Sequence, residues 1–143
     1  MRLCLPLLCL LLCLPAAAEQ RVEQDGFIVH YAAIRTTDLT PEVARQFNVR
    51  RRGKQALLVL NAQRVEDGGA VVPVAATATG RVTSLLGHLQ KLDLRPVQEG
   101  PVHYVLAEFE TLNREYLTVD VQLTPQGATR PIRVKFQQQF YND

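Results

Sequence analysis

The chain has few of the side chains that act as nucleophiles or as soft metal ligands. Its only methionine is Met1, and its three cysteines all lie near the N-terminus: Cys4, Cys9 and Cys13. The only serine, Ser84, lies between Thr83 and Leu85 with no Gly-x-Ser-x-Gly elbow around it. Serine nucleophiles need an adjacent positioned base, so we interpret Ser84 as a turn or cap residue.

The only long apolar run is N-terminal and short for a membrane span. Leu3–Leu14 holds about a dozen residues with Pro6 inside it, whereas a bilayer requires roughly 20. Arg2 precedes the run and Pro15–Ala18 supplies small residues after it, which is the pattern of a signal peptide. We expect residues 1–18 to be cleaved after Ala18. The cysteines lack the small residues that precede a lipoprotein cysteine, so we expect no lipid anchor.

Residues 19–143 are therefore expected to form a single exported domain without disulfides or a transmembrane segment. No cysteine remains to form a thiolate site, and without cysteine or methionine a soft copper site is excluded. Without Arg2, fifteen basic residues face fourteen acidic ones, a formal charge of +1. This balance gives no general attraction to nucleic acid or to anionic membranes.

Alternating apolar and polar residues dominate the last third of the chain. Leu117–Leu123 and Ile132–Phe140 each place apolar side chains at every second position. This period of two predicts strands with one buried and one wet face, which need a second layer to cover them. Whether the last strand lies at an edge or inside a sheet stays open.

Five further strands are expected between residues 27 and 109: Phe27–Ile34, Gln55–Arg64, Ala70–Thr79, Leu89–Val97 and Val102–Phe109. The first two are expected to be central, and Pro73 suggests an edge or a bulge in the third. Gly80–Gly87 is interpreted as a strand tail and one helical turn. Thr40-Pro41-Glu42 predicts the start of a short helix covering an end of the molecule. The fold class is mainly β, an antiparallel β-sandwich of about seven strands with one or two short helices.

Three stretches resemble a known family. They are Tyr31–Ile34 leading into Leu39–Ala44, then Leu85-Leu86-Gly87, and the ending Val134–Asp143 with its Phe-x-x-x-Phe-Tyr-x-Asp pattern. Together they are similar to domain-of-unknown-function family 4426, small exported proteins of Gram-negative bacteria. Thr36-Thr37 departs from the Asn-Ser pair usual there. The resemblance implies a periplasmic location and an immunoglobulin-like sandwich, and it transfers no catalytic residue.

The spacing of the histidines and glutamates does not favour a metal site or an acid–base site. His30, His88 and His103 are far apart, although two strands of a sheet could bring His30 and His103 together. Glu108 and Glu110 share a strand face but are more simply read as solvated residues at a strand end. We therefore predict no metal, no cofactor and no catalytic residue.

The densest charge cluster is the best candidate for a binding site. It places four cations within five residues: Arg50, Arg51, Arg52 and Lys54. Guanidinium groups suit phosphates, lipid headgroups or acidic partner surfaces, although such runs are more often solvated loops.

Three hypotheses follow. The first is a non-enzymatic periplasmic binding or envelope-assembly module that contacts another envelope protein, for example by accepting an extended segment at a sheet edge. The second is a binder of an anionic small molecule or lipid headgroup through Arg50–Lys54. The third is a hydrolase of unrecognised type.

Overall fold

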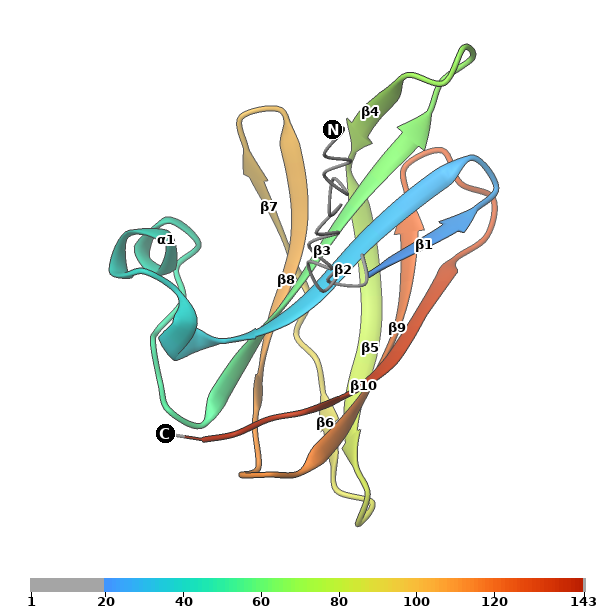
Figure 1. The fold of residues 1–143 in the computed structure, drawn as a ribbon. Coiled ribbons are helices and arrows are strands. Elements are labelled where there is room, and N and C mark those ends of the chain that lie inside the picture. The colour runs from blue at the N-terminus through green and yellow to red at the C-terminus, as the bar shows by residue number, and fades with distance from the viewer. Residues whose placement is uncertain (1–19, 143) are drawn as a thin grey trace, which may run out of the picture.

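The structure, a computed structural model, describes residues 20–142; the predicted signal peptide lies outside the described residues. Two antiparallel sheets face each other (Figure 1). The first has the order β1-β2-β3-β8-β7, with β4 also paired to β3, and the second has the order β10-β9-β5-β6. The strands are β1 Arg21–Gln24, β2 Phe27–Arg35, β3 Gln55–Val65, β4 Val71–Val74, β5 Ala76–Ser84, β6 Leu89–Lys91, β7 Arg95–Glu99, β8 Val102–Glu110, β9 Tyr116–Pro125 and β10 Ile132–Gln139.

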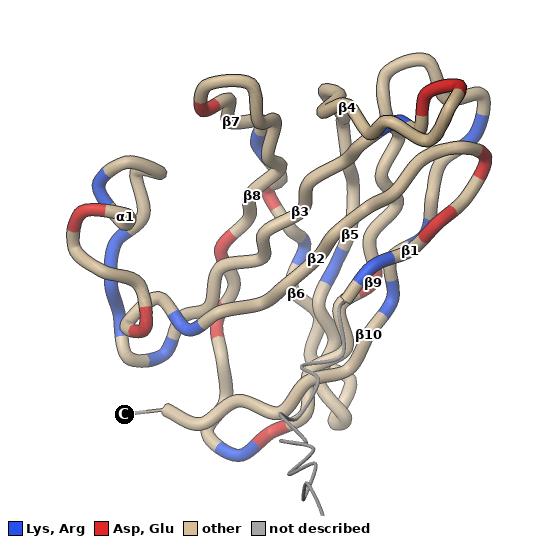
Figure 2. The backbone as a smooth tube through the Cα atoms, turned by 45° about the horizontal axis from the view of Figure 1, so that its top comes forward, with Lys and Arg blue, Asp and Glu red and all other residues tan. Residues whose placement is uncertain are grey.

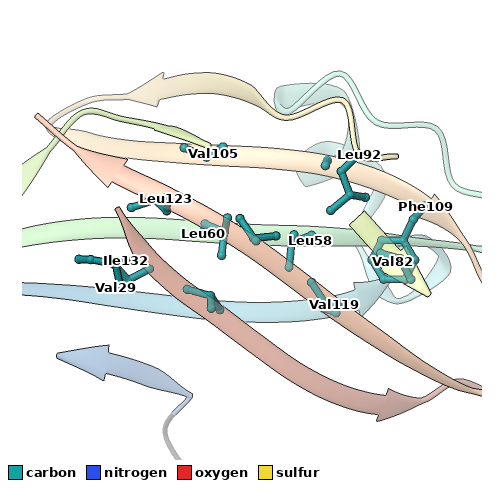
Figure 3. Close-up of a cluster of buried hydrophobic side chains, with 14 of the residues drawn as sticks. Val29, Leu58, Leu60, Val82, Leu92, Val105, Phe109, Val119, Leu123 and Ile132 are labelled. Carbon is teal, nitrogen blue, oxygen red and sulfur yellow. The ribbon is translucent and has the colours of Figure 1, made fainter. Parts of the chain in front are cut away.

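The predicted β-sandwich is confirmed by the core between the sheets. Alternate side chains of both sheets point into the same space (Figure 3). On β9 four of the inward residues are at most 1% exposed: Leu117, Val119, Val121 and Leu123. Leu58, Leu60 and Val105 meet them from the first sheet. Each such side chain stabilises the fold by about 1.5–3 kcal/mol, so this seam holds the two layers together.

Ten strands replace the expected seven, because three elements were missed. β1 forms before Phe27, where no strand was predicted. The single strand expected over Ala70–Thr79 is β4 in the first sheet and β5 in the second, divided at Ala75. Leu89–Val97 is likewise divided into β6 and β7 at residues 92–94. At both places the chain passes from one sheet to the other through a bend. A bend of this kind need not interrupt the apolar pattern of the sequence, so the boundary between the two strands was not predicted.

Within the stretch Gly80–Gly87 the expected strand tail is present, since β5 continues to Ser84, but the helical turn expected after that tail is a β-turn. The Gly87 amide donates to the Ser84 carbonyl at 3.0 Å, which joins β5 to β6 as a hairpin. Pro73 lies on β4, which pairs only with β3, as its missing amide suggested.

The short helix is confirmed at its predicted place in the sequence, but it packs against a different part of the fold from the one expected. α1 spans Pro41–Gln46, and the Thr40 hydroxyl accepts the Val43 amide at 3.2 Å as the predicted N-cap. Asn48 ends it with φ 55°, in the left-handed region. A 3-10 turn, Thr36–Asp38, precedes it.

The segment around α1 covers the outer face of the first sheet, not an end of the sandwich. Leu39, Phe47 and Val49 pack with Leu57 and Leu106 in a second apolar cluster. Arg95 of β7 also donates to the Phe47 carbonyl at 3.2 Å. Since Leu57 and Leu58 point to opposite faces and are both buried, β3 is central, as predicted.

β2 is central only in part. It lies between β1 and β3, but His30, Ala32 and Ile34 on its outer face are half-buried. No helix within residues 20–142 is long and apolar enough to cross a membrane.

Candidate binding surfaces

One edge of β2 is only half covered. β1 pairs with Phe27–His30, and the Tyr31 amide donates to the Gln20 carbonyl at 3.0 Å. Main-chain groups of alternate residues face alternate sides of an antiparallel strand, so the Ala33 amide and carbonyl also face this side. Within the described chain no strand pairs with β2 there, and the Ala33 carbonyl accepts only the Gln138 side chain, at 3.1 Å.

The last strand lies opposite this edge. β10 pairs with β9 and with no other strand of the described chain, so it is an edge strand, which the sequence left open. A cavity of about 390 Å³ separates the uncovered part of β2 from the end of β10. Its lining includes Ala33, Ile34, Gln138 and Tyr141. Two strand edges thus flank one hollow.

Ring and side-chain contacts hold the two edges in place. Tyr31 of β2 and Phe136 of β10 lie with their ring centroids 4.8 Å apart. Further along, Arg35 bonds both carboxylate oxygens of Asp38, at 3.1 and 2.8 Å, and the Tyr141 carbonyl at 3.0 Å. The Arg35–Asp38 pair therefore lines the hollow itself, whereas the ring pair joins the two strands outside its lining.

The predicted cluster of cations forms an exposed loop between α1 and β3 (Figure 2). Arg51 donates to the Thr37 carbonyl at 3.0 Å. Arg52 and Lys54 line a common hollow of about 310 Å³, whose lining does not include Arg50 or Arg51. Glu110 and Thr111 line it too, and the Thr111 amide donates to the Lys54 carbonyl at 3.0 Å. A carboxylate beside two cations lowers the attraction for an anion.

The histidines do not meet. Asn61 of β3 pairs with His30 on one side and with Tyr104 on the other. His103 precedes Tyr104, so its side chain points to the opposite face of the sheet from that of His30. His30 Nε2 lies 3.0 Å from Gln63 Oε1, and His88 is in the β5–β6 turn. No three His, Cys, Asp or Glu side chains are grouped to hold a metal anywhere in residues 20–142.

The remaining candidates have structural roles. The Ser84 hydroxyl is buried and accepts the His88 amide at 3.0 Å, so it caps the turn as expected. Glu108 accepts hydrogen bonds from Arg95 at 3.0 Å and from Gln55 at 3.2 Å. Glu110 is exposed, and its main-chain carbonyl and amide form hydrogen bonds with the side chain of Gln90.

A group of cations that the sequence did not indicate lies on the outer face of the second sheet. Register places Lys135, Asp120, Arg81 and Lys91 side by side on four strands. Arg133 bonds both oxygens of Asp120, at 3.0 and 2.9 Å, and its hydrogen bond lowers the pKa of that carboxyl. These residues are scattered from 81 to 135, so only strand pairing brings them together.

The fold is that of a small two-sheet β-sandwich with open edges. The chain belongs to the DUF4426 family, described as a domain of unknown function, whose family model matches residues 21–143. This confirms the resemblance found in the sequence.

Solved structures show the same fold. A DUF4426 family protein, PA0388 from Pseudomonas aeruginosa PAO1, is 26% identical with a TM-score of 0.73, over 87% of this chain and 96% of that chain. A copper-bound variant of FetP from uropathogenic Escherichia coli is 14% identical with a TM-score of 0.60, over the same shares of the two chains. FetP as isolated is 13% identical with a TM-score of 0.58, over 86% and 93%. No curated protein matches the sequence.

Proposed function

We propose that this protein is a non-enzymatic periplasmic binding module that accepts an extended segment of another envelope protein beside β2. The observation that carries the proposal is the Ala33 main chain, which faces a hollow of about 390 Å³ with no strand of the described chain beside it. The signal-peptide pattern of residues 1–18 supports the location.

An incoming segment would bond to the edge as a new strand. Main-chain hydrogen bonds supply affinity in this mode, and pockets for alternate side chains supply specificity. Here the segment would take the place of the Gln138 amide at the Ala33 carbonyl and would also accept from the Ala33 amide. The Arg35–Asp38 pair at one end of the hollow offers a place for a polar residue of the partner.

Copper, which the FetP variant holds, is not part of the proposal. Residues 20–142 contain neither cysteine nor methionine, and they hold no group of three His, Asp or Glu side chains suited to a metal. The donor set therefore does not fit.

The experiment is site-specific photo-crosslinking in the cell envelope. A photoreactive residue at Gln139, which lines the hollow, should capture a partner, and one at Gln98, exposed on β7 at the other edge of the first sheet, should not. The captured segment, made as a peptide, should bind the purified protein. Ala33→Pro removes the outward amide and should abolish binding. Proline is tolerated on a strand edge. Recovery of no partner from the envelope fraction, or binding unchanged by Ala33→Pro, would contradict the proposal.

A second candidate is a small phosphate-type anion in the hollow beside Arg52 and Lys54. The observation that favours it is the convergence of these two cations on one hollow. Inorganic phosphate should raise the melting temperature, and Arg52→Ala with Lys54→Ala should remove the shift. Arg50→Ala is the matched control, since Arg50 is outside that hollow. An equal shift in the double variant would reject this candidate.

A further inference from the structure

The tip of the β5–β6 hairpin carries leucines that the fold does not bury. Leu85 is 66% exposed, Leu86 88% and Leu89 52%. The turn that presents them is well bonded, because the Ser84 amide donates to the His88 carbonyl at 2.9 Å and the Gly87 amide to the Ser84 carbonyl at 3.0 Å. The leucines are thus held outward by ordered main chain. In Figure 1 this hairpin extends beyond the neighbouring strands.

These leucines do not serve the folded domain itself. A β-turn needs polar or small residues for its geometry, and nothing in that geometry requires two adjacent leucines. Leu86 buries almost none of its surface within the described chain. Exposed apolar side chains that gather at one place mark contact sites.

Cations begin directly beside the apolar tip. Leu89 and Lys91 are two residues apart on β6, so they share its outer face. Lys91 pairs with Arg81, and the same row continues to Lys135 on β10. Leu89, Arg81 and Lys91 also line one open hollow of about 470 Å³.

The outer face of the second sheet carries mostly positive charge. Along β5, β6, β9 and β10 the outward positions hold four cations, Arg81, Lys91, Arg133 and Lys135, against one carboxylate, Asp120. Arg133 already bonds both oxygens of that carboxylate. Arg81 and Lys135 also act on Asp120 electrostatically, but one carboxylate balances only one of the four cations. The face therefore keeps an excess of positive charge for an external anion, which a whole-chain balance of +1 does not reveal.

From this juxtaposition we infer that the β5–β6 tip and the adjacent outer face of the second sheet dock on an anionic lipid surface. Leu85 and Leu86 enter the boundary between headgroups and acyl chains, where apolar side chains leave water. Arg81, Lys91 and Lys135 lie against the negative headgroups. An apolar edge joined to a cationic face complements a bilayer, whose apolar interior lies directly beneath its charge. The surface is formed by strands other than β2, so this inference is independent of the proposed function.

The absence of tryptophan allows a direct test. Leu86→Trp places a single fluorophore at the tip, and Val71→Trp places one at an exposed valine on β4. With vesicles of phosphatidylglycerol and phosphatidylethanolamine, the emission of the first should shift to the blue and the second should not change. Pure phosphatidylcholine vesicles should give a much smaller shift, because the cations then have no counter-charge.

Vesicle flotation of the full mature chain measures how much the leucines and the cations each contribute to membrane binding. Leu85→Ser with Leu86→Ser should lower the partition coefficient at least about tenfold. Arg81→Gln and Lys91→Gln should each lower it about fivefold, less at high salt. Val71→Ser and Arg45→Gln are the matched controls, with an exposed valine on β4 and an exposed cation on α1, and should bind as the wild type does. Unchanged melting temperatures would show that all variants fold.

Three results would overturn the inference. The first is no flotation with anionic vesicles, and the second is flotation that the serine variant leaves intact. The third is a dimer in sedimentation that the serine variant dissolves in the absence of vesicles, which would assign the tip to a second copy of the chain.

Discussion

The Thr36 hydroxyl and the main chain of Arg52 bond to each other in both directions. Thr36 Oγ1 donates to the Arg52 carbonyl at 2.9 Å and accepts from the Arg52 amide at 2.8 Å. Thr36 is completely buried and Arg52 is exposed, so the two bonds tie a surface loop to a buried hydroxyl. The loop that carries the four cations is thereby fixed to the turn before α1, at the position where the chain departs from its family pattern.

Thr36→Val should therefore destabilise the fold. The substitution keeps the shape of the side chain and removes both hydrogen bonds to Arg52. Each bond contributes about 0.5–1.5 kcal/mol, so the expected loss is about 1–3 kcal/mol. Urea denaturation measures the change in the free energy of unfolding. Thr77→Val, at an exposed outward position of β5, is the control and should change it by less than about 0.5 kcal/mol. Equal effects would show that the Thr36 bonds do not stabilise the loop.

Gly80→Ala should also destabilise the fold, for a steric reason. A Cβ at Gly80 would lie 2.6 Å from Val121 Cγ2 and 2.7 Å from the Asp120 carbonyl oxygen. Overpacking of this kind costs about 1–3 kcal/mol, and thermal or urea denaturation would detect it. Adding Val121→Ala should restore only part of the loss, because the contact with the Asp120 main chain remains. A neutral Gly80→Ala would mean that β5 and β9 can separate freely at this pair.

The Asp120–Arg133 pair should make stability depend on acid pH. The hydrogen bond from Arg133 lowers the pKa of Asp120 in the folded state below its usual 3.8. A lowered pKa contributes stability that is present above 3.8 and is lost as the pH falls from there through the folded pKa. Denaturation of the wild type and of Asp120→Asn at a series of pH values measures this. The variant should lose less stability over that range, and parallel curves would contradict the assignment.

The main chain of Ala33 should exchange hydrogen faster than its neighbours do. Ala32 and Ile34 form hydrogen-bonded pairs with β3, whereas the Ala33 amide faces the uncovered side of β2. Its exchange rate by NMR should exceed theirs by roughly tenfold or more. A bound segment should protect it. If Ala33 is already as protected as Ala32 in the free protein, the edge is not open and the proposed site fails.

Most of the local structure could be predicted from the amino-acid sequence alone. Strict alternation identified β9, β10 and the core side chains from Leu117 to Val134, because side-chain direction in a strand depends only on neighbouring residues. The Thr40 cap likewise located α1. The family resemblance was also readable from local motifs.

Which strands are neighbours could not be predicted from the sequence. Ala75 and residues 92–94 pass the chain between the sheets without a break in the apolar pattern, so two strands were read as one in each case. The open edge at Ala33 depends on where β1 begins, and the cationic face depends on the pairing of Arg81 with Lys91 and Asp120. Strand pairing is set by contacts between residues far apart in the chain, and no local pattern encodes them. For that reason both proposed surfaces became visible only in three dimensions.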